Sequence, residues 1–282
     1  MNDLEKEKQM IEEAVSGNQA ALEALLSGVQ DMVFNLSLRM LGTKPDAEDA
    51  TQEILIKIMT RLSSFRQECR LSTWVFRIAV NHLKNDRKGR FSHAAFSFEA
   101  YGADIVSGKE KDIPDKSGGA DRELLERELK YSCTNVMLQC LDAQSRCIFV
   151  LGTMFRLNSK IAADILEMTP EAYRQKLSRI RRKVADFLSQ YCGLSGSGLC
   201  SCKRRIDYAI ESRRIDPANL DYCSMKPCNY TEIIRYTDAM EELDELSQIF
   251  AGLPAYRAAE NTAILVSSDK FNAILRGPEA TI

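Results

Sequence analysis

The sequence has few of the residues that interrupt helices, with 14 glycines and 7 prolines among 282 residues. Aromatic residues, which are enriched in strands, make up only 7% of it. Both shortages favour helices over a strand-rich fold. The chain is 45% hydrophobic and 28% charged, which is typical of a folded protein and not of a disordered one. We therefore expect a helical protein of one large domain or two to three small ones.

Long apolar runs and a surplus of one charge are also missing. No stretch approaches the about 18 apolar residues of a membrane span, and no apolar run follows a basic start. The nine cysteines are odd in number, which favours reduced thiols. We expect a cytoplasmic protein with no membrane contact. The net charge of −2 is an average, because 7 basic and 13 acidic residues give residues 206–282 a net charge of −6.

Helical periodicity divides the chain into two patterned stretches, residues 9–90 and 121–191. Between them, the serines, glycines and charges of residues 91–120 predict a flexible linker. Residues 192–282 form a C-terminal extension with weaker patterning, which we expect to be mostly helical and which is strongest over residues 230–250. The predicted fold is all-α, with two small helical domains and this extension.

Capping residues predict where several helices begin and end. Gly42 suits the C-terminal cap of the helical stretch that precedes it. Asp46 is the predicted N-cap of the following helix, and Ser159 the N-cap of a short helix in the second stretch. Thr169 and Pro170 are expected at the N-cap and first position of a longer helix.

The predicted helix over residues 72–88 has two different faces. Five apolar residues form its buried stripe, namely Val75, Phe76, Ala79, Val80 and Leu83. An arc of about 100° on the other side carries an aromatic ring, two amides and three cations, namely Trp74, Arg77, Asn81, Lys84, Asn85 and Lys88. Cations suit phosphates, amides suit base edges and a ring can stack on an unpaired base. A solvated helix face would explain the same pattern.

A short helix, a tight turn and a longer basic helix are predicted over residues 159–187. The apolar stripe of the longer helix consists of Tyr173, Leu177, Ile180, Val184 and Phe187. Its outward side carries Glu171, Arg174, Gln175, Ser178, Arg179 and Arg182. This arrangement is typical of helix-turn-helix proteins, whose second helix enters the DNA major groove. A structural helix pair with a basic surface is the alternative.

The third feature is acidic. The run Asp46-Ala47-Glu48-Asp49-Ala50-Thr51-Gln52-Glu53 begins a helix whose outer face combines Asp49, Gln52 and Glu53 with the apolar Ile56. Such a face suits a complementary protein surface. Carboxylates at a helix start, where the macrodipole favours them, explain it equally well.

In this order, the three features resemble the extracytoplasmic-function sigma factors of bacterial RNA polymerase. The resemblance rests on the acidic run above and on Ser72-Thr73-Trp74-Val75-Phe76-Arg77-Ile78-Ala79-Val80-Asn81-His82-Leu83-Lys84-Asn85. It continues in Leu141-Asp142-Ala143-Gln144-Ser145-Arg146 and Ser178-Arg179-Ile180-Arg181-Arg182-Lys183-Val184. It covers about half of the chain.

The resemblance implies that residues 9–90 are sigma region two. Asp49, Gln52, Glu53 and Ile56 would dock on the clamp helices of the largest polymerase subunit. Trp74, Arg77, Asn81, Lys84, Asn85 and Lys88 would bind the minus-ten element and help to melt it. The loop of residues 67–71 would form a pocket for an extruded base.

By the same resemblance, residues 121–191 are sigma region four. Glu171, Arg174, Gln175, Ser178, Arg179 and Arg182 would read the minus-thirty-five element. The implied function is promoter recognition, promoter melting and transcription initiation with core RNA polymerase. The chain would not be an enzyme and would require no cofactor. The promoter sequence, the inducing signal and the existence of an anti-sigma partner stay open, and the rival interpretation is a DNA-binding regulator that never docks on polymerase.

Three positions depart from the family pattern in the helix-turn-helix. Lys160 stands where an acidic residue is usual, Glu167 replaces a turn glycine, and Ala172-Tyr173 replaces a Thr-Val pair. Because a residue other than glycine at positive φ is strained, we expect an altered turn at Glu167. These changes affect the expected promoter sequence more than the function.

The extension carries cysteines at positions 192, 200, 202, 223 and 228. Cys192, Cys200, Cys202, Cys223 and Cys228 are candidate ligands of a Zn²⁺ site, although the paired C-x2-C spacing of strong zinc motifs is missing. Redox-responsive thiols and inert cysteines are the alternatives. The apolar positions of residues 240–250 predict that the extension packs on the sigma domains and modulates polymerase or promoter binding.

Overall fold

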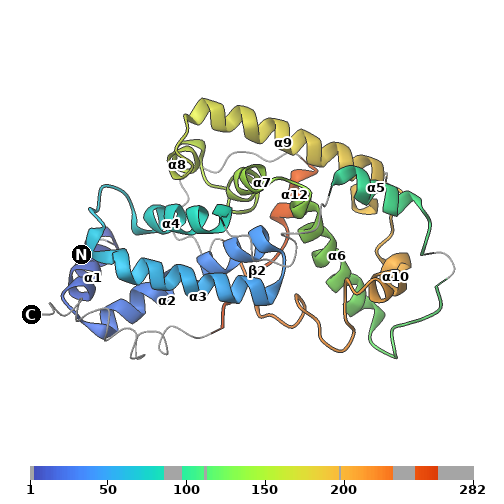
Figure 1. The fold of residues 1–282 in the computed structure, drawn as a ribbon, viewed down its shortest axis with the longest axis horizontal. Helices are drawn as coiled ribbons and strands as arrows, with labels where there is room; N and C mark the ends of the chain where they lie inside the picture. Colours follow the sequence, from blue (N-terminus) through green and yellow to red (C-terminus); the bar gives the residue numbers. More distant parts are fainter. Residues whose placement is uncertain (1–2, 86–96, 111–112, 197, 231–244, 260–282) are drawn as a thin grey trace, which may run out of the picture.

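The computed structural model describes residues 3–85, 97–110, 113–196, 198–230 and 245–259. In these ranges the protein is almost entirely helical, as the sequence predicts, and its only named strands are two residues long (Figure 1). We keep the names first domain and second domain for the predicted units around residues 9–90 and 121–191, although one hydrophobic core runs through both. The first contains α1 (Asp3–Val15), α2 (Gln19–Leu41), α3 (Lys44–Arg61), the 3₁₀ turn η1 (Leu62–Ser64) and α4 (Leu71–Asn85). None of the helices in the described ranges is long and apolar enough to cross a membrane.

Helix α2 lies at the centre of the first domain and is buried along most of its length. Asn18 caps it by accepting the backbone N–H of Ala21. Gly42 ends it at a φ of 86°, a left-handed conformation that glycine adopts without strain, which confirms the predicted C-cap. Because α1, α3 and α4 cover only part of its surface, α2 has a further side for other segments to cover.

The start of α3 differs from the prediction. Thr43 is the N-cap, and its Oγ1 accepts the backbone N–H of Asp46 at 3.3 Å, so Asp46 already lies in the first turn. The predicted N-cap was Asp46, three residues later, which would have left Pro45 outside the helix. A proline is well tolerated in a first helical turn, where its missing N–H costs no hydrogen bond.

The segment predicted to be a flexible linker contains α5 (Phe98–Val106). Phe98 and Tyr101 pack on Phe187 of α9, with ring centroids 5.0 and 5.5 Å apart. At Gly102 a Cβ atom would lie 2.7 Å from the ring of Tyr191, so only glycine allows this close approach. The hydrophilic composition of residues 91–120 concealed this short apolar helix.

The second domain contains α6 (Arg122–Gln139), α7 (Ala143–Phe149), the π-helical turn η2 (Val150–Met154), α8 (Ser159–Ile165) and α9 (Pro170–Tyr191). Thr169 caps α9 and Pro170 opens it, as predicted. Asn158, and not Ser159, is the N-cap of α8, because its Oδ1 accepts the N–H of Ile161 at 2.9 Å. Glu167 has a φ of 55°, so it adopts the left-handed conformation of the turn glycine that it replaces and carries the expected strain, and this residue gives no sign of the altered turn.

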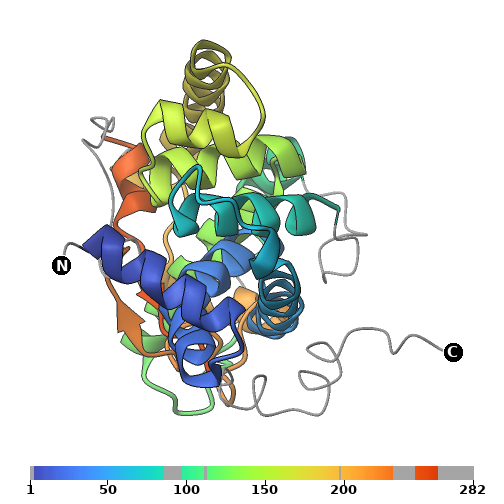
Figure 2. The same cartoon turned by 90° about the vertical axis from the view of Figure 1, so that its left-hand side faces the viewer.

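The described part of the extension has shorter helices than its patterning predicts. It contains η3 (Gly193–Ser195), η4 (Lys203–Arg205), α10 (Ile206–Glu211), β1 (Pro227–Cys228), α12 (Ser247–Ala251) and β2 (Ala255–Tyr256). Strands β1 and β2 pair antiparallel. Most of the stretch expected to be strongly helical, residues 230–250, lies outside the described residues. In Figure 2 the orange and red segments run along one side of the molecule, from the blue helices of the first domain to the yellow-green helices of the second.

Candidate nucleic-acid interface

Helix α4 buries the predicted apolar stripe and leaves part of the predicted polar face exposed. Val75, Phe76, Ala79, Val80 and Leu83 are all buried, which confirms the stripe. On the other side, Asn81 and Asn85 are exposed, whereas Trp74, Arg77 and Lys84 are half-buried. Lys88 lies outside the described residues. The structure therefore places five of the six predicted residues on one helix, with both amides open to solvent.

The loop before α4 supports the aromatic end of this face. The ring of Trp74 lies 5.1 Å from that of Phe65, at an interplanar angle of 37°. Gln67 is exposed and has a φ of 57°, so the backbone turns sharply at the start of residues 67–71. At the end of this loop, the N–H of Leu71 is donated to Glu7 of α1. The C-terminal end of the loop is thus fixed to α1.

One residue of this face contacts the second domain. Arg77, whose side chain is 34% exposed, forms an ion pair with Asp164 of α8, whose side chain is 53% exposed. This pairing could not be predicted from the sequence, because the two residues are 87 positions apart. In this conformation the guanidinium that would meet a phosphate already holds a carboxylate.

Helix α9 presents its predicted outer face to solvent. Glu171, Arg174, Gln175, Ser178, Arg179 and Arg182 are all exposed. The five residues of the predicted inward stripe are buried, which fixes the orientation of the helix: Tyr173, Leu177, Ile180, Val184 and Phe187. Arg181 differs from its neighbours because its guanidinium donates to Thr153 Oγ1 at 3.2 Å and to the carbonyl of Gly152 at 3.0 Å. It supports the turn beneath α9. Among the exposed cations, Arg174 donates to Ser159 Oγ of α8 at 3.2 Å, so it also joins the two helices.

The acidic face of α3 lies beside α4. Asp49, Gln52 and Glu53 are exposed and Ile56 is half-buried, so the mixed face exists as the sequence predicts. His82 of α4 lies against this helix, with Nε2 3.5 Å from Glu53 and Nδ1 in contact with Lys57. His82 was not among the predicted functional residues. The structure shows that it joins the two helices carrying the candidate polymerase and DNA residues.

The five cysteines of the extension do not form one site. Cys192 and Cys200 are joined by an isolated backbone bridge, whereas Cys223 lies beside Leu124 of α6 and Cys228 is in β1. Among the described residues, no three His, Cys, Asp or Glu side chains are arranged to hold a metal ion. The five-cysteine zinc hypothesis is therefore not supported.

Burial also makes the extension thiols poor nucleophiles. It raises the pKa of the Cys200 thiol to about 11 and that of Cys202 to about 12. Thiol oxidation proceeds through the thiolate, which is scarce at neutral pH when the pKa is so high. Between the redox-responsive and the inert alternatives, this environment favours inert cysteines.

Comparisons with known proteins agree with the geometry. Residues 25–91 match the family model described as Sigma-70 region 2. The RNA polymerase sigma-H factor of Pseudomonas aeruginosa is 25% identical over 183 residues, which are 64% of this chain and 92% of that protein. The ECF RNA polymerase sigma factor SigW of Bacillus subtilis is 35% identical over 74 residues, 26% of this chain and 40% of SigW.

A solved structure of CnrH in complex with the cytosolic domain of CnrY has a TM-score of 0.46 at 21% identity, covering 64% of this chain and 96% of that chain. The first domain is a sigma-70 region 2 domain, because the match spans α2, α3 and α4. The sequence relatives are sigma factors as well, so beyond this domain the chain is similar to the extracytoplasmic-function sigma factors that its motifs predicted.

Proposed function

We propose that the chain binds core RNA polymerase and directs promoter recognition, promoter melting and transcription initiation. The match of residues 25–91 to sigma-70 region 2 carries this conclusion, because it covers the helices on which the polymerase and minus-ten residues lie. The polymerase supplies all the chemistry, so the chain needs no cofactor and no catalytic group. Its place of action is the cytoplasm, where polymerase and DNA are found.

The minus-ten element is bound by the face of α4. Asn81 and Asn85 are exposed amides suited to base edges, and Trp74 offers a ring for stacking on an unpaired base. Arg77 and Lys84, together with Lys88, supply positive charge for the strand backbone. Residues 67–71 form the wall against which an extruded base is held. Pyrimidine–purine steps such as TA are the most easily unstacked, so melting by these groups is selective.

The minus-thirty-five element is read by α9. The exposed residues Arg174, Gln175 and Arg179 lie in its first three turns, which is the part of a recognition helix that meets base edges. Glu171 accepts from a cytosine amine, while Ser178 and Arg182 contact phosphates at the edges of the groove. The strained turn at Glu167 sets the angle at which α9 leaves α8.

Core polymerase binds the acidic face of α3. Asp49, Gln52, Glu53 and Ile56 meet the clamp helices of the largest subunit, the carboxylates pairing with cations and Ile56 covering an apolar contact. The existence of an anti-sigma partner stays a prediction.

Transcription in vitro with core polymerase on a genomic library tests the whole function. We expect discrete promoters that share one sequence. The test of docking is a core-polymerase pull-down with Asp49→Lys plus Glu53→Lys, which should abolish retention. The matched control, Glu12→Lys plus Glu123→Lys, makes the same charge change on exposed residues of α1 and α6 and should bind normally. A DNA-binding regulator would ignore polymerase in every variant, and this outcome would refute the proposal.

A further inference from the structure

The described part of the extension crosses between the two domains. We use the term tail segments for residues 221–230 and 245–259. On α2 of the first domain, Asn35 donates to the carbonyl of Tyr256 at 2.7 Å and accepts its N–H at 2.9 Å. Arg257 pairs with Asp31 at 2.7 Å, and the hydroxyl of Tyr222 donates to the carbonyl of Gly42 at 2.7 Å. The tail thus covers the side of α2 that the other helices of the first domain leave open.

The same tail segments are anchored on the second domain. The buried carboxylate of Glu128 in α6 accepts the backbone N–H groups of residues 221, 222 and 223 at 2.8, 3.0 and 2.7 Å. The rings of Phe250 and Phe149 meet edge to face at 5.1 Å, and those of Tyr230 and Phe155 do the same. The tail is therefore bound to both domains through buried groups.

One buried cation ties the three parts together. Arg39 of α2 is completely buried. Its guanidinium donates to Asn135 Oδ1 of α6 at 3.1 Å, to the carbonyl of Pro254 at 2.7 Å and to the hydroxyl of Tyr230 at 3.3 Å. A buried charge is tolerated only when its donors are satisfied. Two of these three acceptors belong to the tail. If the tail is withdrawn, the buried guanidinium of Arg39 loses both of them, and the closed arrangement of the two domains around it is destabilised.

The closed arrangement occupies groups that the proposed function needs elsewhere. Arg77 of the minus-ten face holds Asp164 of the helix-turn-helix, and α4 lies against α7 and α8. Arg146 of α7 donates to the carbonyl of Met40 at the end of α2. Two promoter elements on one duplex are separated in space, whereas here the domains that read them are packed together (Figure 1).

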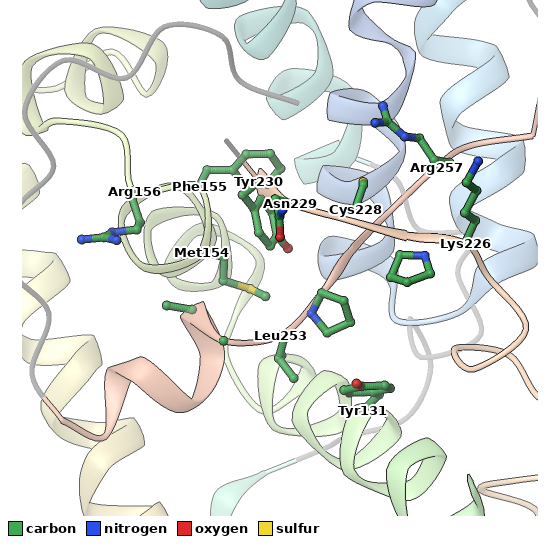
Figure 3. A pocket seen from close by; sticks show the side chains of 14 residues that line it. Tyr131, Met154, Phe155, Arg156, Lys226, Cys228, Asn229, Tyr230, Leu253 and Arg257 are labelled. Carbon is green, nitrogen blue, oxygen red and sulfur yellow. The ribbon is translucent and has the colours of Figure 1, made fainter. Parts of the chain in front are cut away.

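A solvent-open pocket of about 770 Å³ lies between the tail and the second domain, lined by Tyr131, Met154, Phe155 and Arg156 on one side and by tail residues on the other (Figure 3).

We propose that the tail is an intramolecular inhibitor, which holds the two sigma domains in a closed form that competes with binding to core polymerase and promoter DNA. The proposal rests on the proposed function. Polymerase binds the open form, so its apparent affinity falls by the fraction of molecules that are open. Loosening the tail raises that fraction without changing any residue that touches polymerase or DNA.

The test uses the full chain with Phe250→Ala plus Tyr256→Ala, two buried tail residues outside both proposed interfaces. The control variant, Val106→Ala plus Leu199→Ala, shortens two exposed apolar residues. We measure the dissociation constant for core polymerase and the radius of gyration by small-angle X-ray scattering. The tail variant should bind about 10-fold more tightly and be larger, while the control matches the unaltered chain. Equal affinities for all three chains would overturn the proposal and leave the proposed function intact.

If the variant with Phe250→Ala plus Tyr256→Ala loses helical structure, a second test reverses the charges of the ion pair between Arg257 and Asp31. Arg257→Asp places two carboxylates together at Asp31 and should tighten polymerase binding about 3-fold, since exposed pairs have modest energies. Adding Asp31→Arg restores an ion pair of opposite orientation and should return the affinity to that of the unaltered chain. An unchanged affinity in the single variant speaks against inhibition. If no chain binds polymerase at any concentration, the proposed function fails and the inhibitor proposal fails with it.

Discussion

The carboxylate of Glu128 offers a sharp test of how the tail is held. It is 2% exposed and accepts three backbone N–H groups, all from consecutive tail residues. Glu128→Gln keeps the shape of the side chain but leaves only one acceptor oxygen and no charge. A hydrogen bond to a charged acceptor contributes about 1.5–3 kcal/mol. Loss of one such bond and weakening of the others should lower the free energy for detaching residues 221–223 from α6 by about 2–4 kcal/mol.

Amide hydrogen exchange measures this opening directly. At residues 222 and 223, exchange should accelerate about 30-fold or more, because each 1.4 kcal/mol is a factor of ten. Amides of α2 and α9 should change less, since the perturbation is local to the tail. Glu123→Gln, an exposed position on the same helix, is the matched control and should leave exchange unchanged. If Glu128→Gln accelerates exchange less than about 3-fold, the carboxylate does not anchor the tail, and the reasoning fails at its first step.

Three further predictions concern α9, the turn before it and the thiols. Arg182→Ala should reduce by about 1 the slope of log affinity against log salt for minus-thirty-five DNA, whereas Arg181→Ala should leave this slope unchanged and lower the melting temperature, since Arg181 supports the turn beneath the helix. Equal slopes in both variants would contradict their separate roles. Glu167→Gly should stabilise the protein by about 0.5–1 kcal/mol in urea unfolding, because it relieves a φ of 55°, and a loss of stability would contradict this. Alkylation of Cys200 and Cys202 should be about 100-fold slower in the folded than in the unfolded chain at pH 8. Because their folded pKa values are raised from 9.0, stability should be constant below pH 9 and fall as the pH rises toward 11, and fast alkylation at pH 8 would refute the burial argument.

Local sequence signals predicted much of the fold because their causes are local. Gly42 ends α2 and Thr169 begins α9, since a left-handed glycine and a side-chain cap act within one turn of chain. The apolar stripes of α4 and α9 were predicted because 3.6-residue periodicity is a property of the helix itself. The N-cap of α3 was wrong by three positions, as Asp46 and Thr43 are both good caps and only the fold decides between them.

The contacts that join the domains could not be predicted, because their partners are far apart in the sequence. Arg39 looks in sequence like a cation in the last turn of a helix, where the dipole favours it. Its acceptors are 96 to 215 residues away. Glu128 likewise resembles a solvated residue of a charged helix. The burial of such a polar residue cannot be predicted from the local sequence, because the segments that form its hydrogen bonds are distant in the chain.

The energies of these contacts indicate where the closed form is stabilised. The pairing of Arg77 with Asp164 is half-exposed, and exposed pairs contribute about 0–1 kcal/mol, so it cannot hold the domains together alone. Breaking the partners of a buried charge costs about 3–5 kcal/mol, and Arg39 is such a charge. The free energy that separates closed from open therefore resides mainly in the tail and Arg39. Arg77 instead makes the two states exclusive, because one guanidinium cannot hold Asp164 and a promoter phosphate at once.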